Sequence, residues 1–439
     1  MSQLEQLATK TMASLLSLGA EEAVVSVSEG THTTLQRRDG KVEQATEAST
    51  RGLAISLLVD DRWSNHSTSD LRDDALATFM ARAVEATRLL EPDPDRRLPP
   101  VQECGRGVSE ETLDQLDPHF SERTTEQRAT EAVELERAVA EHAPNGLVSS
   151  STFVADGRSR AVMVMSNGFS GSHEGAWFSS GGEATLTDGE RRPEAYAYYG
   201  ARYRGDLPSP EAIAIELRAR AHERIGSGPV ASGTYPMILA NHAVGRILGI
   251  LAGPLSGGAI HQRRSCLADK LGETIGASCL TIIDDPTLPR GLGSRPWDSD
   301  GRVARVMPVI EAGVLKRHYI NTYYSRKLGV SATTSGSSNW VVRPGDRSPE
   351  AIAAALPKAI LVTGFLGGNS NAATGDFSFG IRGVLLENGA PTRSLSEMNV
   401  RGSVLDVFKR LAEVGDDPWG YSSVRSPSLL FADMEFSGA

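Results

Sequence analysis

The sequence predicts an α+β fold, built from curved antiparallel sheets with flanking helices and divided into two domains. Asp-Gly or Asn-Gly pairs, which favour tight hairpins, stand at 39–40, 167–168, 188–189 and 388–389 between strand-like segments. Segments with helical spacing of apolar residues precede and follow these strand-rich regions. Because hairpins are grouped together and do not alternate regularly with helices, an α+β class is favoured over a doubly wound parallel sheet.

The first domain is expected to span residues 1–228. Its elements should be a helix that stops at Gly19, four or five antiparallel strands up to residue 67, and a helix over 70–90. A proline-rich charged linker at 91–100 leads into a helical region, 109–143, with its clearest periodicity over 125–141. Strands return over 147–204. A helix over 209–225 then starts with Ser209 as N-cap and Pro210 in its first turn.

The second domain is expected to span residues 229–439 and to be rich in strands. It follows a stretch of small residues at 226–233. A short strand is predicted at 235–239, a helix at 241–251, a hairpin around 388–389, a helix at 404–412 and a final strand at 429–436.

Composition excludes several function classes. The chain has 439 residues and a formal net charge of -10, so it repels phosphate backbones, and a nucleic-acid partner is not expected. The three cysteines form no disulfide framework, which predicts a reducing, cytoplasmic setting. The longest apolar stretch, 247–260, is broken by glycine and proline and is shorter than the ~20 residues that cross a bilayer, so no membrane association is expected.

Common catalytic motifs are absent from the sequence. It contains neither a phosphate-binding P-loop nor a dinucleotide-binding glycine pattern, and its two His-Glu pairs have no second histidine one helical turn on. His261 and Cys266 are five residues apart, and Cys279 follows, but this spacing matches no common zinc pattern. Burial of the cysteines as small apolar residues is the alternative interpretation.

One segment resembles a known metallopeptidase motif. Residues 239–248 read LANHAVGRIL. This is similar to the TldD/TldE (PmbA) family, also called modulators of DNA gyrase, whose catalytic member carries HExxxH within a run like LHEAVGHGLEG. On that alignment Asn241 takes the place of the first histidine, His242 that of the glutamate and Arg246 that of the second histidine. The catalytic member also uses a cysteine near its C-terminus, and the last nineteen or so residues of this chain contain none.

These replacements remove the chemistry of the motif. Asparagine is a poor zinc ligand, and arginine is a permanent cation that repels the metal. Without the glutamate no general base is present to activate a bound water. A purely structural alternative is that Asn241 caps the helix and Arg246 is solvated on its surface. Both interpretations predict no catalysis and no metal at this position.

Longer stretches extend the resemblance through most of the second half. They lie at 254–273, 284–301, 309–329 and 363–389, and together they are similar to the TldE (PmbA) branch of the family. The resemblance implies a metal-free subunit that pairs with a zinc-bearing, TldD-like catalytic subunit. The two subunits enclose a chamber that admits unfolded or extended peptides for degradation or processing. No cofactor is expected in this chain, and zinc is expected in the partner.

The resemblance also nominates residues at the chamber or the subunit interface: Gly367, Gly368, Asn369, Thr374, Gly375, Asp376 and Phe377. Glycine allows close backbone approach, whereas Asn and Asp offer hydrogen bonds. The alternative is that these are only turn residues between strands.

Three other possibilities stay open at this point. One alternative is a stand-alone hydrolase with a site rebuilt around His242, His261 or Cys266. Another is a binding or modulator protein that acts on DNA-associated targets. A homodimer is a further possibility where the partner is absent.

Overall fold

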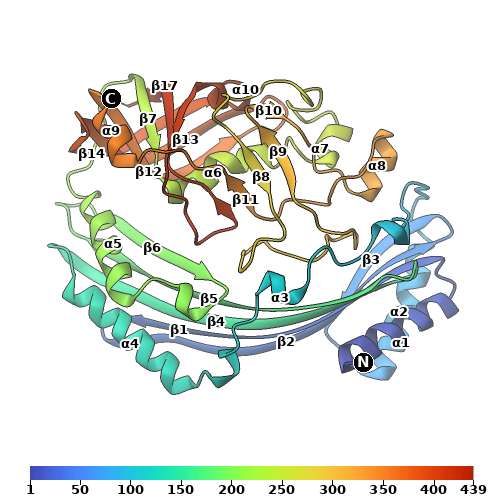
Figure 1. The fold of residues 1–439 in the computed structure, drawn as a ribbon. Coiled ribbons are helices and arrows are strands. Elements are labelled where there is room, and N and C mark those ends of the chain that lie inside the picture. The colour runs from blue at the N-terminus through green and yellow to red at the C-terminus, as the bar shows by residue number, and fades with distance from the viewer. Residues whose placement is uncertain (439) are drawn as a thin grey trace.

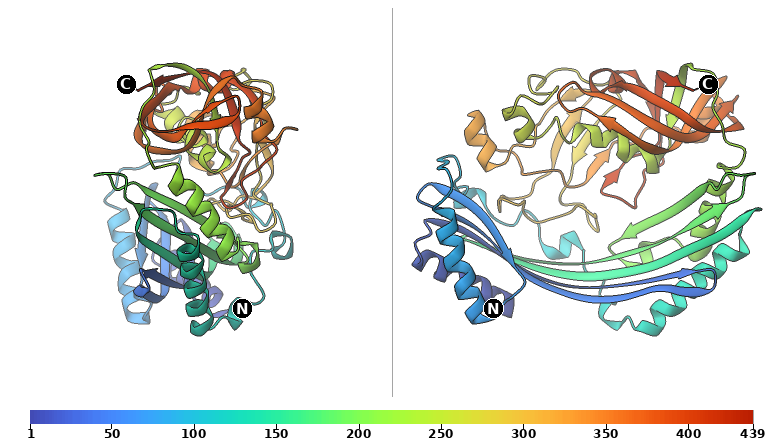
Figure 2. Two further views of the ribbon diagram at one scale, coloured as in Figure 1. Left: turned by 90° about the vertical axis from the view of Figure 1, so that its left-hand side faces the viewer. Right: turned by 180° about the vertical axis from the view of Figure 1, so that it is seen from behind.

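The computed structural model describes residues 1–438 and contains one large sheet in its N-terminal half (Figure 1). The strand order is β3-β2-β1-β4-β5-β6, and every neighbouring pair is antiparallel. The strands are β1 (Glu22–Arg38), β2 (Lys41–Val59), β3 (Arg62–Thr68), β4 (Leu147–Met165), β5 (Ser170–Leu186) and β6 (Glu194–Ala201). The long strands bow along their length, as the view from behind in Figure 2 shows. The predicted α+β class with curved antiparallel sheets is thus confirmed.

The strands of this sheet are longer and fewer than expected in the first ninety residues. The prediction of four or five strands is wrong, because β1, β2 and β3 account for the whole region. Thr31 within β1 pairs with Ser49 of β2 on one side and Arg158 of β4 on the other. Pairing on both edges keeps the polar middle of β1 extended. The hairpin itself forms at the predicted place, with positive φ at Asp39 and Gly40.

Helices cover the sheet at its two ends. In Figure 1, α1, α2 and α4 lie on the convex side of the sheet. The helices and short turns of this half are α1 (Gln3–Ser17), α2 (Asp73–Thr87), α3 (Glu110–Leu113), α4 (Thr125–Glu141) and α5 (Pro210–His222). The Ser209 hydroxyl accepts a hydrogen bond from Ala212 N, which confirms the predicted N-cap. Helices α4 and α5 share one apolar core with β4, β5 and β6.

The C-terminal half contains a second six-stranded sheet that closes on itself. Its order is β14-β13-β12-β7-β17-β15, and β14 also pairs with β17. All pairs are antiparallel except β7 with β12. The strands are β7 (Gly233–Leu239), β12 (Lys358–Ser370), β13 (Asp376–Glu387), β14 (Ala390–Ser403), β15 (Leu411–Val414) and β17 (Leu429–Ser437). Closure leaves β14 and β17 with partners on both sides over part of their length.

A smaller sheet and several short helices complete this half. The sheet has the order β10-β9-β8-β11-β16, with strands β8 (Ile282–Asp284), β9 (Met307–Glu311), β10 (Val314–Leu315), β11 (Trp340–Val342) and β16 (Val424–Arg425). The helices are α6 (Val244–Leu248), α7 (Gly257–His261), α8 (Thr322–Leu328), α9 (Pro349–Ala354) and α10 (Val404–Val407). The main apolar core of this half lies between the two sheets and α6.

Two predicted helices differ from the structure. The segment 241–251 is divided into a 3-10 turn at Asn241–Ala243, α6, and a second 3-10 turn at Gly249–Leu251. The predicted helix at 404–412 is wrong in its last residues, because Leu411–Val414 is strand β15. Leu411 and Val414 are buried and pair with Phe431 and Leu429 of β17. Ladder hydrogen bonds and burial outweigh the local helical preference there.

The two halves face each other, with the C-terminal half above the concave side of the long sheet (Figure 1). The chain passes from one to the other between α5 and β7, near the predicted boundary at residues 228 and 229. Aromatic contacts join them, since the rings of Trp419 and Tyr421 lie 5.5 and 4.9 Å from that of Tyr199 on β6. No helix in residues 1–438 is long and apolar enough to cross a membrane.

Candidate functional site

The motif-like segment lies directly after β7, where Asn241 is held by backbone groups. Its Nδ2 donates to the carbonyl of Asp417 at 2.8 Å, and its Oδ1 accepts from the N–H of His242 at 2.6 Å. The N-cap of the 3-10 turn at Asn241–Ala243 is Ala240 and that of α6 is Ala243, and neither has a capping side chain. The alternative that Asn241 caps the following helix is therefore wrong. Its amide instead ties the end of β7 to the 417–428 segment.

His242 is held as a neutral imidazole. Its Nε2 lies 2.9 Å from the carbonyl oxygen of Thr363, which only accepts hydrogen bonds, so Nε2 carries the proton. Its ring lies 5.7 Å from that of Trp419. Burial, followed by the positive charge of Arg220, lowers the pKa of His242 to about 4. The histidine is thus uncharged at neutral pH, and Nδ1 is its free acceptor.

A cavity of about 490 Å³ opens beside this histidine, between the two halves of the chain. Its lining comes from β6, α5 and the turn after it, α6, β12 and Trp419. This arginine cavity, as we call it, is lined by Arg220, Arg224 and Arg246, and none of its lining residues is acidic. In a protein of net charge -10, this is a local concentration of positive charge.

Two of these arginines are buried. Arg220 and Arg224 are each 9% exposed. Arg220 donates from Nε to Glu216 at 2.7 Å and from Nη1 to the carbonyl of Tyr196 at 3.1 Å. Its Nη2, and Nε of Arg224, are buried without a hydrogen-bond partner among residues 1–438. Burial, together with the charge of Arg382, lowers the pKa of Arg224 to about 10, so the guanidinium remains protonated at neutral pH.

Arg246 differs because it is exposed to the cavity. Its guanidinium lies 4.6 Å from the ring centre of Phe379, in a cation–π arrangement. It forms no ion pair among the described residues. Tyr196 and Tyr198 of β6 also line the cavity, stack at 5.2 Å and are each 41% exposed. The cavity wall thus combines cations with aromatic surface.

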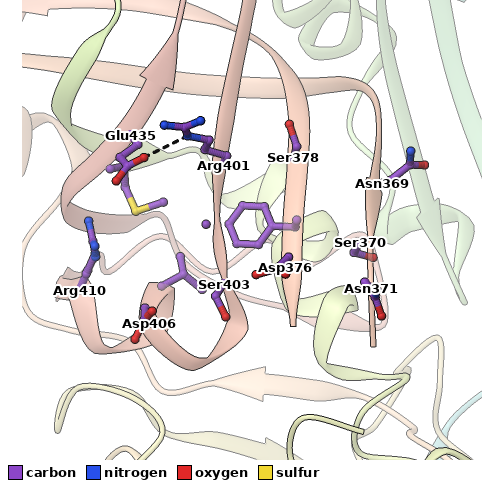
Figure 3. Close-up of a pocket in the computed structure, with 14 residues that line it drawn as sticks. Asn369, Ser370, Asn371, Asp376, Ser378, Arg401, Ser403, Asp406, Arg410 and Glu435 are labelled. Atoms are coloured by element: carbon purple, nitrogen blue, oxygen red, sulfur yellow. Dashed lines mark hydrogen bonds and ion pairs between the residues drawn. The ribbon is translucent and has the colours of Figure 1, made fainter. Parts of the chain in front are cut away.

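A second hollow of about 600 Å³ lies at the far end of β12, β13 and β14 (Figure 3). Asn369 and Asp376 stand on one side of it, and Arg401, Arg410 and Glu435 on the other. Arg401 Nε pairs with Glu435 Oε2 at 3.0 Å, and both side chains are more than half exposed. Charges of both signs that are solvated and paired are typical of a protein surface, so this hollow has no obvious ligand chemistry.

The seven residues nominated from 363–389 do not form one site. Gly367 lines the arginine cavity, whereas Asn369, Asp376 and Phe377 line the second hollow. Thr374 and Gly375 belong to the turn between β12 and β13. In that turn, Gly375 N donates to the carbonyl of Asn371 at 2.7 Å.

Gly368 and Phe377 have structural surroundings. Gly368 has φ of +100°, and a Cβ there would lie 2.3 Å from the carbonyl oxygen of Ser378. Phe377 is 4% exposed and stacks on Phe379 at 5.4 Å. Both therefore support the packing of the β12–β13 hairpin.

The alternative rebuilt site is dispersed. His261 ends α7 and lies 6.0 Å from the ring of Tyr324. Cys266 is half-buried near Gly375, and burial raises the pKa of its thiol. In residues 1–438 no three or more His, Cys, Asp or Glu side chains are grouped so as to hold a metal ion.

Comparison with known proteins places this geometry in a family. Residues 23–87 match the model of PmbA/TldA metallopeptidase domain 1, and residues 232–438 match that of the PmbA/TldA metallopeptidase C-terminal domain. A solved structure from Bacteroides thetaiotaomicron, described as a candidate modulator of DNA gyrase, is 34% identical, with a TM-score of 0.95 and 100% of both chains covered. The chain belongs to the PmbA/TldD metallopeptidase family. The metalloprotease PmbA of Escherichia coli O157:H7 is 28% identical, and the match covers 98% of this chain and 95% of that protein. TldE from Thermococcus kodakarensis has the same fold, with a TM-score of 0.85 at 19% identity over 98% of this chain and 100% of that one.

The PmbA/TldD family implies zinc, but the donor set here does not fit that metal. Both polar atoms of the Asn241 amide are engaged by the backbone, and His242 offers one nitrogen. Arg246, at the third motif position, adds a fixed positive charge on the same cavity wall. A zinc site needs three or four neutral or anionic donors around one point. No step of a metal-dependent reaction is therefore assigned to this chain.

Several residues of the arginine cavity could not be linked to it from the sequence. Arg220, Arg224, Tyr196 and Trp419 are separated from the motif by many residues, and only folding brings them to it. The aromatic run at 194–204 and the arginines at the end of a predicted helix were visible, but nothing local links them to residue 242.

Proposed function

We propose that this chain is the metal-free, TldE-like subunit of a two-subunit zinc peptidase, paired with a TldD-like catalytic chain. The observation that carries the proposal is the motif segment itself. Asn241, His242 and Arg246 stand at the positions of ligand, acid/base and ligand, and each side chain is unsuited to that role. Its fold and family are those of peptidases, so its contribution is to bind substrate and complete an enclosure.

The substrate class is an unfolded or extended peptide. The long concave sheet and the facing C-terminal half supply a curved surface that a second subunit can close (Figure 2). Enclosure selects extended chains, because a folded protein is too wide to enter. Backbone groups of exposed strand edges then bind a peptide with little sequence preference.

The test is reconstitution with a TldD-like protein from the same organism. Mass, zinc content and cleavage of an unfolded peptide are measured for each chain and for the mixture. A 1:1 complex with about one zinc ion, active only when mixed, is expected because catalysis needs a complete ligand set. Stoichiometric zinc and cleavage by this chain alone would refute the proposal and direct attention to His242, His261 and Cys266.

A further inference from the structure

We propose that the arginine cavity binds the C-terminal carboxylate of an extended peptide. The inference deepens the proposed function and rests on it, since it names the part of the peptide that this subunit recognises. The cavity is defined by Arg220, Arg224 and Arg246, and it lies at the outer edge of β6.

The two buried arginines of the cavity have unmet hydrogen-bonding capacity. Arg220 Nη2 and Arg224 Nε are buried without partners among residues 1–438. A buried donor without an acceptor costs free energy, and a charged one costs more. A carboxylate supplies two oxygens that accept such bonds in the planar geometry a guanidinium prefers.

The nearby carboxylates neutralise only part of the arginines' positive charge. Glu216 pairs with Arg220, and Glu223 accepts a hydrogen bond from Thr363 at 2.8 Å, with a pKa raised by burial. Arg224 forms no ion pair among the described residues. Arg224 and Arg246 thus carry positive charge that no ion pair among residues 1–438 balances, and Arg382 lies near Arg224, so an anion is stabilised there.

The outer edge of β6 offers a direction from which an extended peptide can reach the cavity. β6 ends the strand order of the long sheet, so its outer edge has no strand beside it in the described structure. Arg220 caps the carbonyl of Tyr196 on that edge. Strand alternation places the backbone groups of Tyr198 on the same edge. A short extended peptide that pairs at Tyr198 therefore ends beside Arg220, where a terminal carboxylate is held and a continuing chain is not.

The experiment uses the full chain and calorimetric titration with N-acetylated, uncharged hexapeptides that end in a carboxylate or an amide. The free acid is expected to bind at least ten times more tightly than the amide, because charge-assisted hydrogen bonds to arginine are lost with the amide. Raising the salt concentration from about 0.05 M to 0.5 M should weaken the binding of the free acid but not that of the amide. Equal binding of acid and amide would overturn the proposal.

Variants locate the site. Arg246→Gln is expected to remove most of the acid preference, and because Arg246 is exposed, folding should be retained. Arg224→Gln tests the buried part of the cavity, with its thermal midpoint measured alongside. Arg401→Gln is the matched control, since this exposed arginine lies in the second hollow. Loss of acid preference in Arg401→Gln, with none in Arg246→Gln, would overturn the assignment.

Two further ligands test whether the cavity recognises a C-terminal carboxylate in preference to a side-chain carboxylate or a phosphate. An amidated peptide with one internal glutamate should bind like the plain amide. If it binds like the free acid, recognition of a chain end is refuted. Inorganic phosphate should compete no better than acetate, and stronger competition by phosphate would also refute a carboxylate site. A chain that prefers the free acid yet forms no complex with a TldD-like protein would keep this site and refute the partner role, and the converse result would do the reverse.

Discussion

Removing the buried carboxylate of Asp156 should lower the stability of the N-terminal half more than most single substitutions. Asp156 lies on β4, is 1% exposed, and accepts hydrogen bonds from Arg128 in the first turn of α4 and from Arg123 just before that helix. Arg128 binds it through two nitrogens at 2.7 and 2.8 Å, and Arg123 adds contacts at 3.2 and 3.3 Å. The arginine side chains are only 13% and 12% exposed, so water cannot replace the carboxylate freely.

Asp156→Ala should therefore leave the buried Arg128 without an ion-pair partner among the described residues, whereas Arg123 keeps Glu131 at 2.7 Å. Breaking a buried ion pair in this way costs about 3–5 kcal/mol. At 1.4 kcal/mol per factor of ten, hydrogen-exchange protection should fall by roughly a hundredfold to a few thousandfold. The amides to follow are those of α4 (Thr125–Glu141) and β4 (Leu147–Met165), read as peptides by mass spectrometry. Local exchange is chosen because a chain of this size need not unfold in one step.

The matched control is Asp73→Ala. Asp73 pairs with Lys10 at 2.7 Å, but the two side chains are 83% and 64% exposed. An exposed pair of this kind contributes less than about 1 kcal/mol. If Asp156→Ala and Asp73→Ala change protection of their own elements by the same small factor, the argument from burial is refuted.

Three further outcomes are expected. The pKa of His242 is lowered from 6.5 in the unfolded chain to about 4 in the folded chain. Between these pH values the unfolded chain therefore binds a proton that the folded chain does not. The free energy of unfolding thus has its full value above pH 6.5 and decreases as the pH falls toward 4. The thermal midpoint of His242→Gln should fall less between those pH values than that of the original chain, and equal slopes would contradict the assignment. Trp419→Ala removes ring contacts to His242 and Tyr199, so exchange of β6 and α5 should accelerate by about tenfold, and unchanged protection would show that the halves are joined elsewhere. Gly368→Ala should lower the thermal midpoint more than Gly367→Ala, because both have positive φ but only Gly368 has backbone where a Cβ would lie; equal effects would refute the steric part.

Much of the fold could be read from short segments. The hairpins at Asp39–Gly40 and Asn388–Gly389 form where two adjacent residues adopt positive φ, and such turns need no distant contact. Helices α1, α2, α4 and α5 follow apolar spacing and, in three of the four, a capping hydroxyl. The end of α10 could not be read in this way, because Leu411 and Val414 become strand only through pairing with β17.

For the candidate site, too, some features follow from the sequence and others only from the tertiary structure. The sequence by itself determined that Asn241, His242 and Arg246 replace metal-binding and acid/base side chains, since ligand chemistry is a property of each residue. Only the tertiary structure decided that Arg220, Arg224, Trp419 and the tyrosines of β6 surround His242. The physical reason is that burial and electrostatic fields are collective. An arginine acquires an unpartnered, buried nitrogen only when segments far apart in the chain exclude water from it together.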